Sequence, residues 1–267
     1  SDITLEILDS TNNVVNTLSS KPRATIGFDW EIKDEEEAFK KAAIPKEAGV
    51  QMASWNLSYA GSEMIPNAML DWGDPLTGPM VPPGTYTVRL KVDDQSYSTT
   101  LKVMPDPRVK MTDAEYREYI GFANSIRDDI TRLTRIVNQL RSVRRQLTAR
   151  NDLLRNEARA AQLVTKSESL IGKLNALEEQ LHNPKAEMPY DILAMKGGVK
   201  LYSRLSALFN FAMEGDGPPT QGVRETYETR KAELNQLEGQ WKELVSKDLP
   251  ALNDAARKLD VPIVLVK

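Results

Sequence analysis

The pattern of apolar and polar residues changes its period in the middle of the chain. Before Pro105–Arg108, short runs alternate apolar and polar residues with a period of two, which is typical of β-strands with one buried face. After this segment, Leu, Ile and Val recur at heptad spacing, which is typical of amphipathic helices. The sequence therefore predicts two domains in an α+β protein, a β-domain over residues 1–108 and a helical domain over residues 109–267.

Two alternating patterns define the β-domain most clearly. Residues 3–7 predict a first strand, and residues 84–103 predict an antiparallel hairpin that turns at Asp93-Asp94-Gln95. A period of two on both arms of the hairpin indicates one buried and one exposed face. We therefore expect an Ig-like antiparallel β-sandwich.

Two further segments of the β-domain carry weaker patterns. Residues 50–59 are expected to form a strand whose core face includes Trp55 and Tyr59. Residues 61–83 are rich in Gly, Pro, Asn and Asp, and are expected to form a long surface loop.

The helical domain begins at a capping-box pattern, Thr112 followed by Glu115. The first helix is expected to run to about Arg150, before a turn at Asn151-Asp152. Its core face is expected to contain Tyr119, Ala123, Ile126, Ile130, Leu133, Val137, Leu140 and Leu147.

Three further helices are expected after the first. The second helix is expected to follow the N-cap offered by Asn151-Asp152, with an apolar stripe from Leu163 to Leu181, and to end at His182-Asn183-Pro184. The other two cover about residues 190–213 and 223–244, with a kink or restart at Pro250. Four such helices bury their apolar stripes against each other, which predicts an up-and-down four-helix bundle. The apolar, β-branched residues 261–267 predict an extended tail pinned to a surface.

Composition excludes several functional classes. The 267 residues carry a net charge of -3 with both signs interspersed, which argues against a nucleic-acid surface. The absence of cysteine excludes disulfides, thiolate catalysis and zinc–thiolate sites. No apolar run approaches the roughly 18 residues that span a bilayer, so no transmembrane segment is predicted. The chain is already in a strand pattern at Ile3, and we expect it to be part of a longer precursor.

No catalytic, cofactor-binding or metal-binding residues are predicted. His182 is the single histidine, at the end of a helix pattern, and is expected to be a C-cap or solvent residue. The acidic runs Asp128-Asp129 and Glu35-Glu36-Glu37 are expected to be solvated. The stretch Gly197–Lys200 lies inside a helix pattern rather than after a strand, so it is not a phosphate loop.

Aromatic and basic residues are the remaining candidates for binding. Trp72, Trp30 and Tyr59 are candidate ligand or interface residues, and Trp72 is the best placed because it lies in a polar loop. For Tyr59, as for Trp55, a core position is the alternative. A series of arginines allows two interpretations. They form either a basic ridge that binds an acidic partner or an exposed helix face whose arginines pair with Glu and Asp, and we favour the exposed face. The ridge would consist of Arg127, Arg132, Arg135, Arg141, Arg144, Arg145, Arg150, Arg155 and Arg159.

Several segments in order resemble one protein family. The segments Trp55–Tyr59, Gly78-Pro79, Pro82–Leu90 and Asp106–Arg108, and the later Asp248–Asn253, resemble the C-terminal region of bacterial exported sortilin-like or BNR-repeat glycosyl hydrolase-type proteins. In that family a β-propeller precedes an Ig-like domain and a helical segment.

The resemblance implies a non-catalytic accessory or scaffolding module of an exported protein. Its expected partner is the propeller domain of the longer protein or another protein, and homodimerisation through uncovered apolar surface is a further expectation. The alternative is a carbohydrate-binding module of a polysaccharide-degrading enzyme, with a polysaccharide as the partner. A stand-alone enzyme is the third hypothesis. No cofactor and no nucleic acid is expected.

Overall fold

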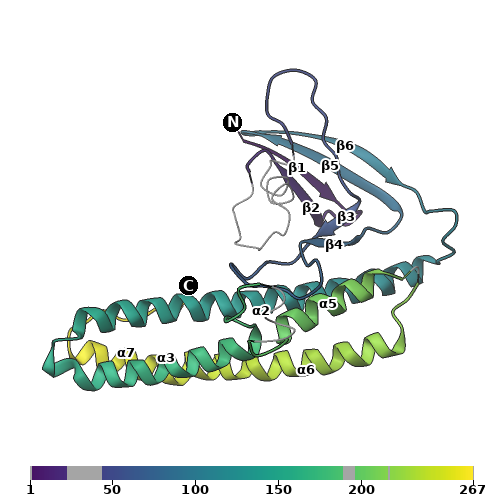
Figure 1. Cartoon of the computed structure of the whole chain (residues 1–267). Coiled ribbons are helices and arrows are strands. Elements are labelled where there is room, and N and C mark those ends of the chain that lie inside the picture. The colour runs from purple at the N-terminus through teal and green to yellow at the C-terminus, as the bar shows by residue number, and fades with distance from the viewer. Residues whose placement is uncertain (1, 23–43, 189–195, 216, 267) are drawn as a thin grey trace. The chain divides into compact units, whose positions relative to one another are not determined.

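The computed structural model shows a mixed α and β protein with a small four-stranded antiparallel sheet and several long helices (Figure 1). It describes residues 2–22, 44–188, 196–215 and 217–266. Contacts within the chain divide it into two units. Unit 1 contains residues 1–67, 74–128 and 208–224, and unit 2 contains residues 68–73, 129–207 and 225–267. The predicted domain boundary after residue 108 stays a prediction.

The four-stranded sheet lies in unit 1. Its strands are β1 (Ile3–Leu8), β2 (Val14–Ser19), β5 (Gly84–Val92) and β6 (Gln95–Val103), in the order β2-β1-β5-β6. Every neighbouring pair is antiparallel. The strands β5 and β6 pair continuously from Gly84↔Val103 to Val92↔Gln95. The predicted first strand and hairpin are therefore confirmed.

The expected strand over residues 50–59 is mostly wrong. A second, two-stranded sheet contains β3 (Ser58–Ala60) and β4 (Thr77–Met80), so the strand begins at Ser58. Leu57 has a φ of 57°, a left-handed conformation that interrupts an extended strand. Trp55 nevertheless packs against the sheet core with Tyr59, as the core alternative predicts.

The expected surface loop over residues 61–83 is also wrong. Ile65 and Val81 are buried in this segment, and β4 forms part of it. Its glycines allow close backbone packing: a Cβ on Gly61 would lie 2.1 Å from the carbonyl oxygen of Leu76. The buried apolar side chains fix this segment in the fold. Its glycines, which suggested an exposed loop, instead let two stretches of its backbone lie in contact.

The hairpin does not have the continuous buried face that its alternation predicts. Tyr86 is buried on β5, whereas Tyr97 and Leu101 on β6 are 58% and 39% exposed. The core that covers this sheet consists of Ile7, Val15, Val81 and Tyr86 with their partly buried neighbours, so it reaches only one end of the hairpin. Strands of three and four residues in the second sheet are too short to cover the rest.

The first helix follows the sequence pattern closely. The helix α2 (Asp113–Leu154) begins with the predicted capping box, in which Thr112 N donates to Glu115 Oε2 at 2.8 Å and Glu115 N donates to Thr112 Oγ1 at 3.3 Å. Its predicted core residues from Ala123 to Leu147 are fully buried. The helix continues through Asn151-Asp152, so the turn predicted there is wrong, and a short 3-10 helix η1 (Ala158–Ala160) follows.

The later helices differ from expectation mainly at their ends. They are α3 (Ala161–Leu181), α5 (Leu201–Met213), α6 (Gln221–Glu243), the π-helical turn η2 (Leu244–Asp248) and α7 (Leu249–Lys258). Of the third predicted helix, α5 contains residues 201–213, and Gly197 and Gly198 are excluded from a helix because their φ values of 95° and 75° do not occur in one. Residues 190–195 of that prediction lie outside the described residues. Pro250 lies in the first turn of α7, directly after the π-helical η2. Glu243 and Asp248 keep helical φ and ψ, so the chain stays helical from α6 into α7 and does not restart at Pro250. The alternative of a kink stays a prediction.

Every helix within the described ranges is too short or too polar to cross a lipid bilayer. This finding agrees with the expectation of no transmembrane segment.

Candidate functional site

The three predicted aromatic candidates do not form one described site. Trp72 belongs to unit 2 and is 47% exposed. Tyr59 belongs to unit 1, packs against the sheet core, and has the guanidinium of Arg127 5.9 Å from its ring centroid. Trp30 lies outside the described residues. Their roles in binding stay predictions.

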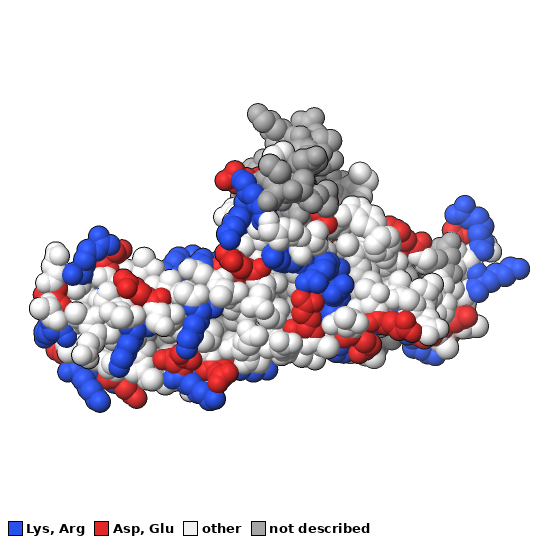
Figure 2. All heavy atoms as spheres, turned by 60° about the horizontal axis from the view of Figure 1, so that its bottom comes forward, with Lys and Arg blue, Asp and Glu red and all other residues white. Residues whose placement is uncertain are grey.

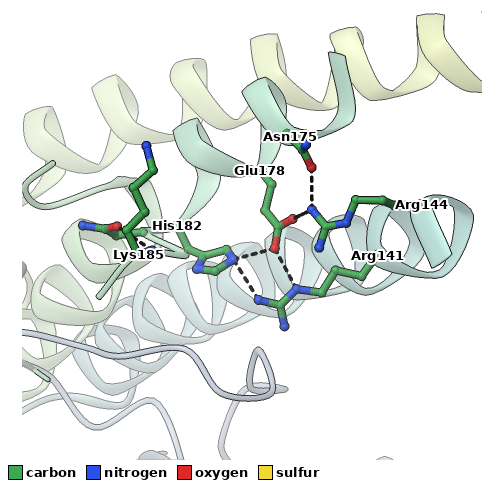
Figure 3. A network of polar contacts seen from close by, with 7 residues as sticks. Arg141, Arg144, Asn175, Glu178, His182 and Lys185 are labelled. Carbon is green, nitrogen blue, oxygen red and sulfur yellow. Dashed lines mark hydrogen bonds and ion pairs between the residues drawn. The ribbon is translucent and has the colours of Figure 1, made fainter. Parts of the chain in front are cut away.

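A buried carboxylate in unit 2 joins the helices α2 and α3 (Figure 3). Glu178 on α3 is 1% exposed and accepts a hydrogen bond of 2.7 Å from Arg141 Nε on α2. Arg144, one turn further along α2, pairs with the other oxygen of Glu178 and donates to Asn175 Oδ1 at 2.8 Å. Both guanidinium groups point to the same carboxylate.

The charge of Glu178 is stabilised by this arrangement. Burial raises the pKa of Glu178, but hydrogen bonds from His182 and Arg141 and the charges of Arg141 and Arg144 outweigh burial and lower the pKa to about 2. The carboxylate therefore stays ionised at neutral pH. Because both oxygens already have partners in α2, the group fastens two helices together.

His182 caps the end of α3, as expected, but it is not a solvent residue. It is 2% exposed, and its Nε2 lies 3.0 Å from Glu178 Oε1 and 3.1 Å from Arg141 Nη2. An arginine can only donate, so Nε2 either accepts from Arg141 or donates to Glu178, and it is the donation to Glu178 that lowers the pKa of this carboxyl. The spacing of four residues between Glu178 and His182 on one helix is the signal in the sequence that indicates their contact.

The paired aspartates also have structural partners. Arg127 Nη2 lies 2.7 Å from Asp128 Oδ1, in unit 1. In unit 2, Asp129 is 9% exposed, pairs with Arg132 at 3.1 Å and accepts a hydrogen bond of 2.9 Å from Tyr227 Oη. The expectation that Asp129 is solvated is therefore wrong. Burial, together with the charge of Asp129, raises the pKa of Tyr227.

The run Glu35–Glu37 lies outside the described residues. Within the described ranges, no group of three or more acidic or histidine side chains could hold a metal ion.

A third polar arrangement in unit 2 binds the extended residues 261–266, which we call the tail. The side-chain amide of Gln146 on α2 donates to Leu265 O at 2.7 Å and accepts from Leu265 N at 3.0 Å. The side-chain amide of Asn253 on α7 does the same for Val264, donating to its O at 2.8 Å and accepting from its N at 2.9 Å. Val264 itself is 2% exposed. The tail is thus pinned by its main chain and one apolar side chain, which agrees with the sequence expectation.

Arg150 also contacts the tail, and its positive charge is unusual because it is buried. Its Nη1 donates to Pro262 O at 3.2 Å, and the residue is 3% exposed. Its Nε and Nη2 are buried without a hydrogen-bond partner within the described residues. Burial lowers the pKa of its guanidinium. We call Gln146, Arg150 and Asn253 the tail clamp.

Six other arginines of the predicted ridge are paired with acidic residues, but only Arg155 and Arg159 are exposed, and both lie beyond the end of α2. Acidic partners are present for Arg127, Arg132, Arg141, Arg144, Arg155 and Arg159. On the face drawn in Figure 2, blue and red side chains are interspersed. Pairing with Glu and Asp is therefore confirmed for these six residues, but the expected exposed face is not, because Arg127, Arg132, Arg141 and Arg144 are only partly exposed. Arg150 differs from all six.

The strand β6 presents an open edge in unit 1. It is the last strand in the order of its sheet, and all of its residues from Gln95 to Lys102 are exposed. Its pairing with β5 is continuous, and the strand contains no proline and one charged residue, Lys102. Bulges, prolines and inward charges are the usual protections of an edge strand. Among the described residues, β6 carries almost none of them.

Comparison with protein-family models, with curated proteins and with solved structures finds no significant match. The resemblance to the exported propeller proteins therefore stays an expectation.

The tail clamp is the arrangement that the sequence analysis missed. Asn253 falls on the apolar face of α7 that includes Leu249, Leu252 and Ala256, and this polar residue in an apolar stripe was the available signal. Nothing in the pattern around Gln146 distinguishes it from an exposed helix residue.

Proposed function

We propose that this chain is a non-catalytic accessory module of an exported β-propeller protein and mediates association with the propeller domain. The finer architecture that accompanies this proposal is an Ig-like β-sandwich followed by an up-and-down four-helix bundle. The observation that carries the proposal is the open edge of β6, a nine-residue strand. Support for the helical architecture comes from ion pairs that join α2 to α3 and α2 to α6, such as Arg141–Glu178 and Arg132–Glu238.

The proposed partner segment is an edge strand of the propeller. An exposed strand offers unpaired backbone N–H and C=O groups, and another strand satisfies them by extending the sheet. The side chains of Tyr97 and Leu101 add apolar area next to this edge. Propeller blades are small sheets and supply strands of matching geometry.

The experiment is a calorimetric titration of the chain with the propeller region of its longer parent protein. The variants Tyr97→Lys and Leu101→Lys place a charge where the partner strand would pack, and are expected to weaken association at least about tenfold. Val14→Lys, at a 49% exposed position on the opposite edge strand β2, is the matched control and is expected to bind normally.

Two results would contradict the proposal. One is a parent protein without propeller repeats, and the other is association that the β6 variants leave unchanged. Sedimentation equilibrium of the chain alone accompanies the titration, because pairing of β6 with a second copy would produce a homodimer instead.

Carbohydrate binding is the second candidate, and the half-exposed Trp72 favours it. Aromatic side chains bind sugar rings through their apolar faces. Affinity electrophoresis in polysaccharide gels tests it: retardation that Trp72→Ala abolishes supports binding, and unchanged migration in every polysaccharide contradicts it.

A further inference from the structure

The tail clamp recognises main-chain groups rather than a particular sequence. Gln146 and Asn253 each pair with both the N–H and the C=O of one residue, and the two residues they hold, Leu265 and Val264, are consecutive. Each amide pairs with its residue as a strand residue pairs across an antiparallel ladder, and because consecutive residues of an extended chain direct their N–H and C=O to opposite sides, the two amides hold the tail from both sides. The one side chain that the site buries is Val264. Any extended segment with a small aliphatic residue at that position has the same groups to offer.

Arg150 carries more donor capacity than the tail uses. A guanidinium has five N–H donors, and the tail provides it with one carbonyl oxygen, that of Pro262. Its Nε and Nη2 are buried and unpartnered within the described part of the chain. A buried cation is stabilised by an anion in contact with it, and a carboxylate matches the planar fork of arginine through two hydrogen bonds.

Asp260, which directly precedes the tail in sequence, does not supply this anion. Asp260 is exposed, has a φ of 54°, and its N–H donates to Arg257 O at the end of α7. Its backbone is thereby fixed in the turn that ends the helix. A separate peptide is free of that connection and can place an acidic side chain beside Arg150.

We propose that the tail clamp is a binding site for an extended acidic peptide, which residues 261–266 occupy in the unbound chain. The ligand has a carboxylate at the position of Pro262 and a small aliphatic residue at the position of Val264. It displaces the tail because its main chain replaces the same hydrogen bonds while its carboxylate pairs with Arg150. This site lies in unit 2 and does not depend on strand addition at β6.

The test uses the full chain with Val264→Asp, which weakens the tail and leaves the clamp unchanged. The probe is a fluorescent hexapeptide, Val-Glu-Ile-Val-Leu-Val, and its match is the same peptide with Gln in place of Glu. Fluorescence anisotropy is expected to show the Glu peptide binding about tenfold tighter or more, the effect of a hydrogen bond to a charged group. Adding Arg150→Gln is expected to remove this preference, and adding Asn253→Leu to weaken both peptides.

A second measurement covers the case in which the Val264→Asp chain does not fold. In the unmodified chain, the side-chain amide resonances of Gln146 and Asn253 are followed by NMR as the Glu peptide is added. Both are expected to shift, and the Gln peptide is expected to shift them less at the same concentration.

Absence of binding to a folded Val264→Asp chain overturns the proposal, as do unshifted amide resonances in the unmodified chain. Equal affinity for the Glu and Gln peptides overturns the assignment of Arg150 as the carboxylate partner. None of these results bears on the titration with the propeller, so the two proposals fail separately.

Discussion

Replacing Glu178 by glutamine tests the role of the buried charge network. The substitution keeps the shape of the side chain and removes its charge, so Arg141 and Arg144 lose a common ionic partner. Their side chains are 21% and 30% exposed, and that of Glu178 is 2% exposed, so solvent compensates only part of the loss. We therefore expect Glu178→Gln to destabilise the folded chain substantially at neutral pH.

The magnitude follows from the pKa of Glu178. The folded structure lowers this pKa from the ordinary 4.5 to about 2. The change corresponds to about 3 kcal/mol in the free energy of unfolding, because each tenfold change in acid dissociation is about 1.4 kcal/mol. A carboxyl whose pKa is lowered by folding stabilises the folded state above its unfolded pKa, and this contribution is lost as the pH falls through the folded pKa. The difference between the original chain and Glu178→Gln is therefore expected to be about 3 kcal/mol at pH 7 and to shrink between pH 5 and pH 2.

Urea unfolding followed by far-ultraviolet circular dichroism measures this difference at several pH values. The matched control is Glu179→Gln, the same change at the next residue. Glu179 pairs with Lys185 at 2.9 Å, but both side chains are about half-exposed, so the expected loss is under about 1 kcal/mol. A Glu178→Gln effect that is as small as the control, or that does not vary with pH below 5, would refute the reasoning.

Other predictions concern single contacts, and each has a simple measurement. Tyr227→Phe removes a hydrogen bond to the buried carboxylate of Asp129 and is expected to lower the free energy of unfolding in urea by about 1–2 kcal/mol. The control Tyr97→Phe, at an exposed position, is expected to cost almost nothing, and equal effects would contradict this account. Gly61→Ala places a Cβ against the carbonyl of Leu76 and is expected to lower the free energy of unfolding in urea by about 1–3 kcal/mol. Gly239→Ala, on the open surface of a helix, is expected to raise it by up to about 1 kcal/mol, and the opposite order would be inconsistent with the packing. Burial raises the pKa of Tyr86 to about 12, so absorbance titration at alkaline pH is expected to show an ionisation near this pH that Tyr86→Phe removes. The stability that this group contributes is complete below pH 10 and declines as the pH approaches 12.

Helix prediction succeeded where a long periodic pattern and local capping agreed. In α2 the heptad residues from Ala123 to Leu147 are buried, and Thr112 and Glu115 form the predicted capping box. The start of α5 was missed because the apolar pattern continues through Gly197-Gly198, and the pattern alone does not reveal that both glycines adopt positive φ. Backbone conformation at glycine decides such a boundary, and the choice depends on tertiary packing.

The β part shows why alternation alone does not define a core. The alternation of β5 and β6 correctly predicted their pairing, but burial requires a second layer, and the short β3 and β4 do not extend that far. Beyond the extended tail itself, Asn253 in the apolar stripe of α7 was the one signal of the tail clamp in the sequence. Asn253 and Gln146 contact the tail from two helices that lie about a hundred residues apart in sequence, and only the folded structure brings them together.

Hydrogen exchange of β6 tests most directly the claim that this chain is an association module. The measurement compares residues 96–102 in the chain alone and in the presence of the proposed partner, a propeller domain. Strand addition predicts that alternate amides of β6 exchange rapidly in the chain alone and become protected on binding, while protection of β2 is unchanged. Binding that leaves β6 exchange unchanged, or protection of these amides already present in the monomeric chain alone, would contradict the account.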